Sequence, residues 1–225
     1  MHPAKEVGGD FYDFFLIDQD HCGVVIADVS GKGVPAALFM MRVKALLNQL
    51  LRGDLSPDQV LARANDGLGE DNEAGMFVTV WLGVLDLRSG KLVYANGGHN
   101  PPLYRHADGS VEWMRDRSGL LLGSFEGVPY RVFERTMIRG DSLILYTDGV
   151  TEAMDASDHC YGDERLFQLV ERECDGYPAS VSGVIEEDVR AFAEGADQAD
   201  DVTLLVLRYD GQENGPAASA AGNRG

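Results

Sequence analysis

Four acidic positions in this chain share a setting that suits cation-dependent chemistry. Asp10 follows two glycines and precedes a β-rich run, Asp28 and Asp148 each end such a run, and Asp200 begins the last one. A single aspartate at a strand end usually caps a turn or a helix. Carboxylates that converge from separate strand ends repel one another, however, unless cations lie between them. The joint pattern therefore predicts a metal site.

The ligand types in this pattern indicate which metal and which reaction. Sites made only of oxygen ligands favour Mg²⁺ or Mn²⁺ over zinc or copper. Two such ions, roughly 3.5–4 Å apart, can share a hydroxide and polarise a phosphoryl group for in-line attack. We therefore expect a metal-dependent phosphohydrolase. Asp201 directly follows Asp200, and either carboxylate of this pair could point into the site.

The elements that must position these residues are predicted by hydrophobic pattern and turn signals. Hairpin-linked strands and helices in sequence-adjacent pairs favour antiparallel sheets covered by helices, an α+β fold, over a doubly wound parallel sheet. The helix after Pro35 is apolar on almost every face and is expected to be largely buried. We predict strands at 11–17, 22–29, 77–87, 91–96, 102–105, 111–114, 130–138, 142–147 and 202–208, and helices at 36–51, 56–68, 163–173 and 180–194.

Composition narrows the possible partners. The 225 residues suit one domain, and 19 Lys and Arg against 37 Asp and Glu give a net charge of −18. Such a surface repels nucleic acid and anionic membranes, so we expect neither as a partner. No apolar run approaches the roughly 20 residues of a membrane span, and the first residues do not form a signal peptide. We expect no membrane insertion and a cytoplasmic location.

Six motifs in a fixed order make the prediction more specific. The chain reads EVGGDFYDFF, ADVSGKGVPAAL, GMFVTVWLGVLD, YANGGHNPPLY, SLILYTDGVTEA and DDVTLLVLR. Together they resemble the bacterial SpoIIE/RsbU-like branch of the PPM (PP2C-type) protein serine/threonine phosphatases, over about residues 3–209. The resemblance implies an αββα sandwich of two antiparallel sheets flanked by helices, and two Mn²⁺ or Mg²⁺ ions. It also implies direct attack by a bridging water, without a phospho-enzyme.

The resemblance also implies a role for each acidic residue. Asp28 would bridge both metals and the Val29 backbone carbonyl would bind the second. Asp148 and Asp200 would hold the first metal, with Asp201 as the alternative to Asp200. Asp10 would act on the second metal, directly or through water. These four aspartates are the expected catalytic residues.

Two positions depart from the eukaryotic members of the family. Those members carry a His two residues after the bridging Asp, often assigned as general acid; here the residue is Ser30, a poor acid. They also carry a phosphate-gripping Arg five residues before the first Asp; here it is Lys5, a point charge without the bidentate fork. Lys5 is a candidate phosphate ligand, and a solvated lysine is its alternative interpretation.

Three further motifs in the chain could suggest other functions. His99, in a Gly-Gly-His-Asn-Pro-Pro loop, is expected to shape the turn rather than to act as a ligand. The Ser30–Gly33 loop lacks the Walker spacing, which argues against nucleotide binding. Asp148-Gly149 echoes the aspartyl-phosphate phosphatases, but Tyr146 stands where their nucleophilic Asp would be. A non-catalytic or weakly active module that docks a signalling partner is the alternative function.

The resemblance also bears on partners and boundaries. It implies that the substrate is a phosphoserine or phosphothreonine on a STAS-type anti-anti-sigma regulator. We expect residues 1–210 to form the phosphatase domain, without its first strand and preceded in a longer polypeptide by a sensor or receiver domain. Residues 211–225, rich in Gly and Ala, are expected to be a disordered tail. The apolar helix pair is a candidate homodimer surface, although core packing explains its hydrophobicity more simply.

Overall fold

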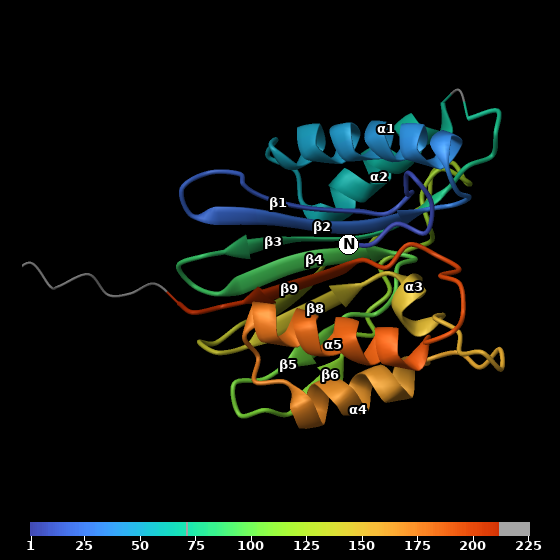
Figure 1. Cartoon of the computed structure of the whole chain (residues 1–225). Helices are drawn as coiled ribbons and strands as arrows, with labels where there is room; N and C mark the ends of the chain where they lie inside the picture. The colour runs from blue at the N-terminus through green and yellow to red at the C-terminus, as the bar shows by residue number, and fades with distance from the viewer. Residues whose placement is uncertain (71, 212–225) are drawn as a thin grey trace, which may run out of the picture.

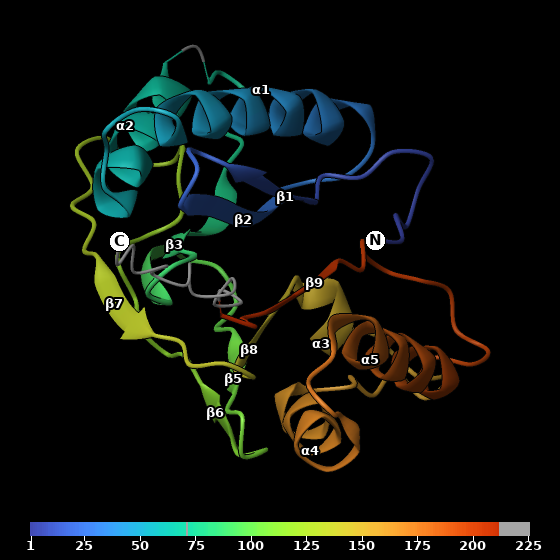
Figure 2. The same ribbon diagram turned by 90° about the vertical axis from the view of Figure 1, so that its left-hand side faces the viewer.

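The molecule is a four-layered sandwich in which two antiparallel sheets are covered on their outer faces by helices (Figure 1). The structure is a computed structural model that describes residues 1–70 and 72–211. The first sheet has the strand order β1-β2-β3-β4-β7, and the second has the order β6-β5-β8-β9. Helices α1 and α2 cover the first sheet, and α4 and α5 cover the second (Figure 2). The predicted α+β sandwich is therefore confirmed. The predicted tail lies, beyond residue 211, outside the described residues.

The elements follow the predicted order closely. A short helix directly after β8, α3, was not predicted. The strands are β1 (Phe11–Leu16), β2 (His21–Val29), β3 (Val78–Asp86), β4 (Lys91–Gly97), β5 (Leu103–Arg105), β6 (Val111–Trp113), β7 (Phe133–Thr136), β8 (Ser142–Tyr146) and β9 (Leu204–Arg208). The helices are α1 (Val34–Leu51), α2 (Pro57–Gly69), α3 (Asp148–Thr151), α4 (Asp163–Glu173) and α5 (Pro178–Phe192).

Three hydrophobic cores hold the layers together. The first lies between α1, α2 and the first sheet and includes Leu47 and Leu61. The second fills the space between the sheets and includes Trp81, which is fully buried. The third lies between the second sheet and α4 and α5. Because side chains alternate along each strand, one strand serves two of these cores at once.

Helix α1 differs from the prediction that it would be largely buried. One face packs on the sheet, but Val34, Leu38 and Met41 are 63%, 68% and 59% exposed. The prediction was wrong because a helix that packs on one sheet buries only the stripe of residues that faces the sheet. The opposite stripe stays exposed even when its residues are apolar. By length and mean hydropathy, α1 alone among the helices of the described residues could also cross a membrane; here it lies on the first sheet.

The strand and helix ends bring the predicted acidic residues to one end of the sandwich. Strand β2 ends at Val29, directly after Asp28, and β8 ends at Tyr146, two residues before Asp148. Strand β1 pairs antiparallel with β2 so that Phe11 lies opposite Ala27, which brings Asp10 beside Asp28. Tyr146 pairs with Leu204, so the chain just before β9 lies beside Asp148.

Candidate active site

Asp10, Asp28, Asp148 and Asp200 meet where the two sheets end together, and we call them the acid cluster. Their mutual effects on ionisation show how closely they lie. The pKa of Asp28 is raised to about 8, first by burial and then by the charges of Asp10, Asp148 and Asp200. The ionisation of Asp28 is therefore affected by all three other aspartates, which means that the strand ends bring the four residues close together.

Asp10 joins the two sheets. Its side chain is 2% exposed, and its Oδ2 accepts hydrogen bonds of 2.7 Å from the hydroxyls of Thr147 and Thr203. Burial raises the pKa of Asp10 to about 7, although these two hydrogen bonds favour the charged form. The two threonines flank the pairing of β8 with β9, so a residue of the first sheet is fixed by hydroxyls of the second.

Asp148 and Asp200 form the more open side of the cluster. Burial raises the pKa of Asp148, with further contributions from the charges of Glu152 and Asp200, while the charge of Lys32 opposes the shift. The Asp200 side chain is 37% exposed, and its Oδ2 lies 2.9 Å from Lys32 Nζ. Lys32 also donates to the Ala199 carbonyl. This side is thus partly neutralised by a lysine.

Asp201 has a different function from its neighbour. Its carboxylate accepts the backbone N–H groups of Ala4 and Gly9, each at 2.8 Å, and that of Asp10 at 3.4 Å. The side chain is 8% exposed. Asp201 therefore anchors the N-terminal segment that carries Asp10, and its charge raises the pKa of Asp10, whereas the charge of Asp200 acts on Asp28 and Asp148.

Three glycines of the predicted motifs allow close approach of backbone around Asp201. A Cβ on Gly8 would lie 2.1 Å from Asp201 Oδ2, and a Cβ on Gly149 would lie 2.0 Å from the Asp201 carbonyl oxygen. A Cβ on Gly9 would lie 2.9 Å from the Val29 carbonyl oxygen. Glycine is required at Gly149 because the close atom belongs to the backbone, whereas a Cβ on Gly8 would displace the Asp201 carboxylate from its hydrogen bonds.

The lysine next to the cluster is not the predicted one. Lys5 is exposed, and the structure gives it no ion pair within the described residues. Lys32, from the loop between β2 and α1, occupies the position beside Asp200 instead. From the sequence, this loop was predicted only not to bind nucleotide. A lysine three residues after Val29, between two glycines, is the pattern that could have indicated a positive charge beside the site.

Ser30 and His99 both have structural contacts. The Ser30 hydroxyl accepts the Phe77 N–H at 2.9 Å, which fixes the end of β2 to the start of β3. His99 is 6% exposed and its Nδ1 lies 2.8 Å from the Thr79 hydroxyl. Burial lowers the pKa of His99 to about 4. The turn itself is formed by Asn96, whose side chain exchanges two hydrogen bonds with the His99 backbone, of 2.7 and 3.0 Å.

The donor set fits a divalent cation by its chemistry. All four cluster side chains are carboxylates, burial raises the pKa of Asp10, Asp28 and Asp148, and repulsion within the cluster adds to the shift at Asp28 and Asp148. A cation between the carboxylates relieves such repulsion. Within residues 1–70 and 72–211, no three His, Cys, Asp or Glu side chains are already gathered tightly enough to bind a metal. Binding would therefore require the carboxylates to rotate toward a common centre.

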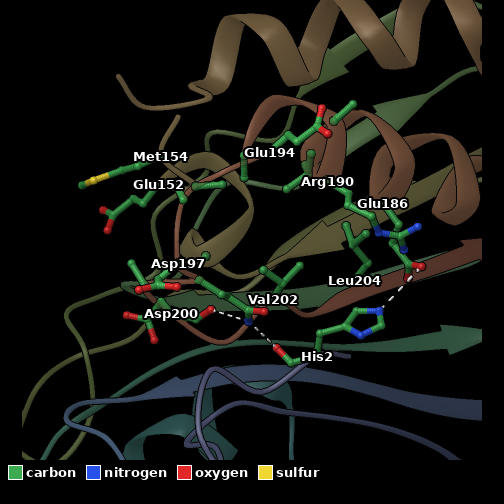
Figure 3. A pocket seen from close by; sticks show the side chains of 18 of the residues that line it. His2, Glu152, Met154, Glu186, Arg190, Glu194, Asp197, Asp200, Val202 and Leu204 are labelled. Atoms are coloured by element: carbon green, nitrogen blue, oxygen red, sulfur yellow. Dashed lines mark hydrogen bonds and ion pairs between the residues drawn. The ribbon is translucent and has the colours of Figure 1, made fainter. Parts of the chain in front are cut away.

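A cavity of about 760 Å³ opens beside the cluster. Lys32, Gly149 and Asp200 are among the residues that line it, and Figure 3 shows His2, Val202 and Leu204 on the side of Glu186 of α5. In Figure 3 the His2 imidazole faces Glu186, at 3.7 Å.

Comparison with known proteins agrees with this architecture. The family model of Stage II sporulation protein E (SpoIIE) matches residues 18–210. The chain belongs to the SpoIIE family. Asp28, Asp148 and Asp200 lie within the matched residues, whereas Asp10 lies before them.

Individual relatives share both sequence and fold. Phosphoserine phosphatase RsbU of Bacillus subtilis is 30% identical over 206 residues, which cover 92% of this chain and 61% of that protein. Protein IcfG of Synechocystis is 29% identical, over 92% of this chain and 37% of that protein. The chain thus spans less than two thirds of these relatives. The SiaA-PP2C domain of Pseudomonas aeruginosa superposes with a TM-score of 0.80 at 22% identity, covering 93% of this chain and 84% of that domain, which supports the PP2C fold.

Proposed function

We propose that this chain is a metal-dependent protein serine/threonine phosphatase whose acid cluster activates water for attack on a phosphoserine or phosphothreonine. The observation that carries the proposal is the raised pKa of Asp28, about 8, in a position next to three further carboxylates. Carboxylates in such a site repel one another when they are ionised, and a bound cation would relieve that repulsion. The phosphoserine phosphatase activity named for RsbU and RsbP supports the same reaction.

Each residue of the cluster has a proposed role. Asp28 and the Val29 carbonyl, together with Asp148, Asp200 and Asp10, would hold two Mn²⁺ or Mg²⁺ ions. When bound, these cations would supply Lewis acidity for attack of water on phosphorus. Lys32 would attract the substrate phosphate, because its ammonium group lines the cavity and lies 2.9 Å from Asp200. Ser30 accepts the Phe77 N–H and is a poor acid, because a serine hydroxyl does not give up its proton readily near neutral pH, so the leaving oxygen would take its proton from water.

The proposed substrate is a STAS-type anti-anti-sigma regulator phosphorylated on serine or threonine. The names of the relatives support this class only at the level of phosphoserine, and a phosphorylated STAS protein is the direct test. We also propose regulation by a sensor or receiver domain in a longer polypeptide. The exposed apolar residues of α1, Val34, Leu38 and Met41, would suit a homodimer or partner contact.

The deciding experiment is hydrolysis of p-nitrophenyl phosphate and of a phosphoserine peptide, with Mn²⁺ or Mg²⁺ and then with excess chelator. We expect activity with metal and its loss with chelator. Full activity in chelator would refute the metal-dependent mechanism. Absence of hydrolysis in every condition, with normal folding, would favour the alternative, a phosphatase-fold module that docks a signalling partner.

A further inference from the structure

His99 lies where the chain crosses from the first sheet to the second. The loop 98–102 joins β4 of the first sheet to β5 of the second, and the His99 side chain is 6% exposed. Asn96, near the end of β4, exchanges hydrogen bonds of 2.7 and 3.0 Å with the His99 backbone. The imidazole is therefore buried at the crossover, on a loop whose own backbone is fixed.

One ring nitrogen of His99 reaches the strand beside Asp28. Nδ1 lies 2.8 Å from the hydroxyl of Thr79, which pairs with Asp28 across β2 and β3. Residues directly opposite each other in an antiparallel pair point to the same face of the sheet. Two residues further along these strands, Ile26 and Trp81 lie in the core between the sheets, so Asp28 and Thr79 face the second sheet as well. The Thr79 hydroxyl is thus a neighbour of the Asp28 side chain.

The carbonyl of Tyr146, at the end of β8, points toward the same crossover loop. The Thr147 N–H donates to the Thr203 carbonyl at 3.1 Å, on the β9 side of β8. In a trans peptide the N–H and the preceding C=O point in opposite directions, so the Tyr146 carbonyl points to the β5 side. Tyr146 is 1% exposed and stands two residues before Asp148. Whatever holds this carbonyl therefore also holds the chain that carries Asp148 into the cluster.

The pairing of β5 with β8 offers no donor to this carbonyl. Leu103 pairs with Ile144, and the same register places Pro101 opposite Tyr146. Because proline has no N–H, the ladder cannot continue onto the Tyr146 carbonyl. A buried backbone carbonyl without a donor is destabilising, so a donor from outside the ladder is needed.

The second ring nitrogen of His99 is the available donor. Nε2 is buried and has no hydrogen-bond partner within the part of the chain that the structure describes. Burial lowers the pKa of His99 to about 4, while the Tyr146 backbone acts in the opposite direction, as a carbonyl near a ring N–H does. Because Nδ1 is taken by the Thr79 hydroxyl, the ring proton belongs on Nε2.

We propose that His99 is a positioning residue that ties the Asp28 side of the acid cluster to the Asp148 side. Its Nδ1 accepts the Thr79 hydroxyl beside Asp28, and its Nε2–H is directed at the Tyr146 carbonyl before Asp148. The imidazole thereby sets the separation of the two sheets at the cation site, without touching cation or substrate. The inference rests on the proposed function, because this separation matters for activity only if the carboxylates share cations.

The first test is the tautomer of the His99 ring, read by NMR from the ¹⁵N shifts of the 225-residue chain at pH 7. We expect a proton on Nε2 and none on Nδ1. Thr79→Val removes the hydroxyl that selects this tautomer, so the ring nitrogens of His99 should shift in the variant while those of the other histidines do not. A proton on Nδ1 with a bare Nε2 in wild type would overturn the proposal, because the ring would then have no donor for the Tyr146 carbonyl.

The second test measures Mn²⁺ binding by calorimetry and hydrolysis of p-nitrophenyl phosphate at saturating Mn²⁺. Thr79→Val and His99→Leu are each expected to weaken Mn²⁺ binding and to lower kcat about 10–100-fold, with KM for p-nitrophenyl phosphate nearly unchanged. Thr79→Ser keeps the hydroxyl and should restore most of both. Val170→Ala, at a fully buried residue of α4 in the third core, is the stability control. It should lower the melting temperature and leave Mn²⁺ affinity and kcat unchanged.

The outcomes separate this inference from the proposed function. If wild type neither binds Mn²⁺ nor hydrolyses the phosphate ester, the proposed function fails and the inference fails with it. If wild type does both and Thr79→Val does them equally well, with His99→Leu either equally active or unfolded, only the inference fails. An equal loss of Mn²⁺ affinity in Val170→Ala would also overturn the inference, because general destabilisation would then explain the effect.

Discussion

The two halves of the acid cluster are held in different ways. Asp10 and Asp28 belong to the first sheet, and Asp10 is fixed by two threonine hydroxyls. Asp148 and Asp200 lie on a short helix and a loop, where Lys32 partly neutralises them. In the sheet-held half Asp10 is buried and Asp28 is half-buried, and burial raises the pKa of both. In the loop-held half Asp148 and Asp200 are half-buried, and Lys32 supplies an opposite charge. We infer that cation binding relieves the first half and that substrate reaches the second.

The largest expected effect is on the sheet-held half. Asp28→Asn should reduce turnover by orders of magnitude, more than the roughly 10–100-fold loss typical of an outer-shell residue. Without metal the variant should melt a few degrees higher than wild type, because a buried carboxyl surrounded by like charges is removed and ~1 kcal/mol corresponds to roughly 2–4 °C at this length.

The measurements are steady-state hydrolysis of p-nitrophenyl phosphate and thermal melting in chelator. Asp54→Asn, at an exposed aspartate outside the cluster, is the control and should change neither. Near-normal turnover by Asp28→Asn would remove Asp28 from the catalytic residues.

The next effect separates Asp200 from Asp201. Asp200→Ala should abolish most activity and leave the free energy of unfolding nearly unchanged, because its ion pair with Lys32 is exposed. Asp201→Ala should lower the free energy of unfolding by about 2–4 kcal/mol, because two buried or half-buried N–H groups lose an acceptor at 2.8 Å. Urea unfolding and turnover of both variants are the measurements. The reverse pattern would assign the ligand to Asp201.

A pH dependence of stability follows from the same half. The folded pKa values of Asp10 and Asp28, about 7 and about 8, lie above the ordinary value of 3.8. Between pH 4 and 8 the folded state therefore keeps protons that the unfolded state has released, so stability falls as pH rises through this window. In chelator, the free energy of unfolding should be at least about 1 kcal/mol lower at pH 8 than at pH 5.

Denaturant titrations at the two pH values measure this slope, and Asp28→Asn is the internal control. The free energy of unfolding of Asp28→Asn should fall less steeply with pH than that of wild type, because the variant lacks the Asp28 carboxyl and keeps all other titrating groups. Equal slopes would show that Asp28 ionises normally.

The smallest effect concerns the two lysines. Lys32→Met should reduce kcat/KM for a phosphopeptide roughly tenfold, equivalent to about 1.4 kcal/mol of transition-state stabilisation. Lys5→Met should change it less, because Lys5 is exposed and forms no ion pair within the described residues. Stability should change by less than about 1 kcal/mol in either variant. A larger loss of kcat/KM for Lys5→Met than for Lys32→Met would favour Lys5 as the phosphate ligand.

Local patterns predicted most of the fold. The helix predicted at 56–68 corresponds to α2, and the β-rich runs predicted at 77–87 and 91–96 correspond to the hairpin of β3 and β4. Strand ends also located Asp28 and Asp148, because a strand boundary is encoded by adjacent residues.

Other features depend on residues far apart in the sequence. Asp200 and Asp201 have the same chemistry, and the sequence does not show that the Asp201 carboxylate is taken up by the backbone N–H groups of Ala4 and Gly9. Lys32 could not be placed beside Asp200 without knowing how β2 and β9 lie in space. The exposed face of α1 depends on how many layers the fold has, which composition does not encode.

The bonds from Asp201 to Ala4 and Gly9 join groups that are 197 and 192 residues apart in the chain. Closing a loop of that size is entropically costly and slow, so contacts of this kind form late in folding. During synthesis, Asp10 leaves the ribosome long before its partners Thr147, Thr203 and Asp201 exist. A nascent or truncated chain that ends before residue 200 therefore contains the complete first sheet without an assembled acid cluster. We therefore expect the proposed cation affinity only in a chain that extends past Thr203.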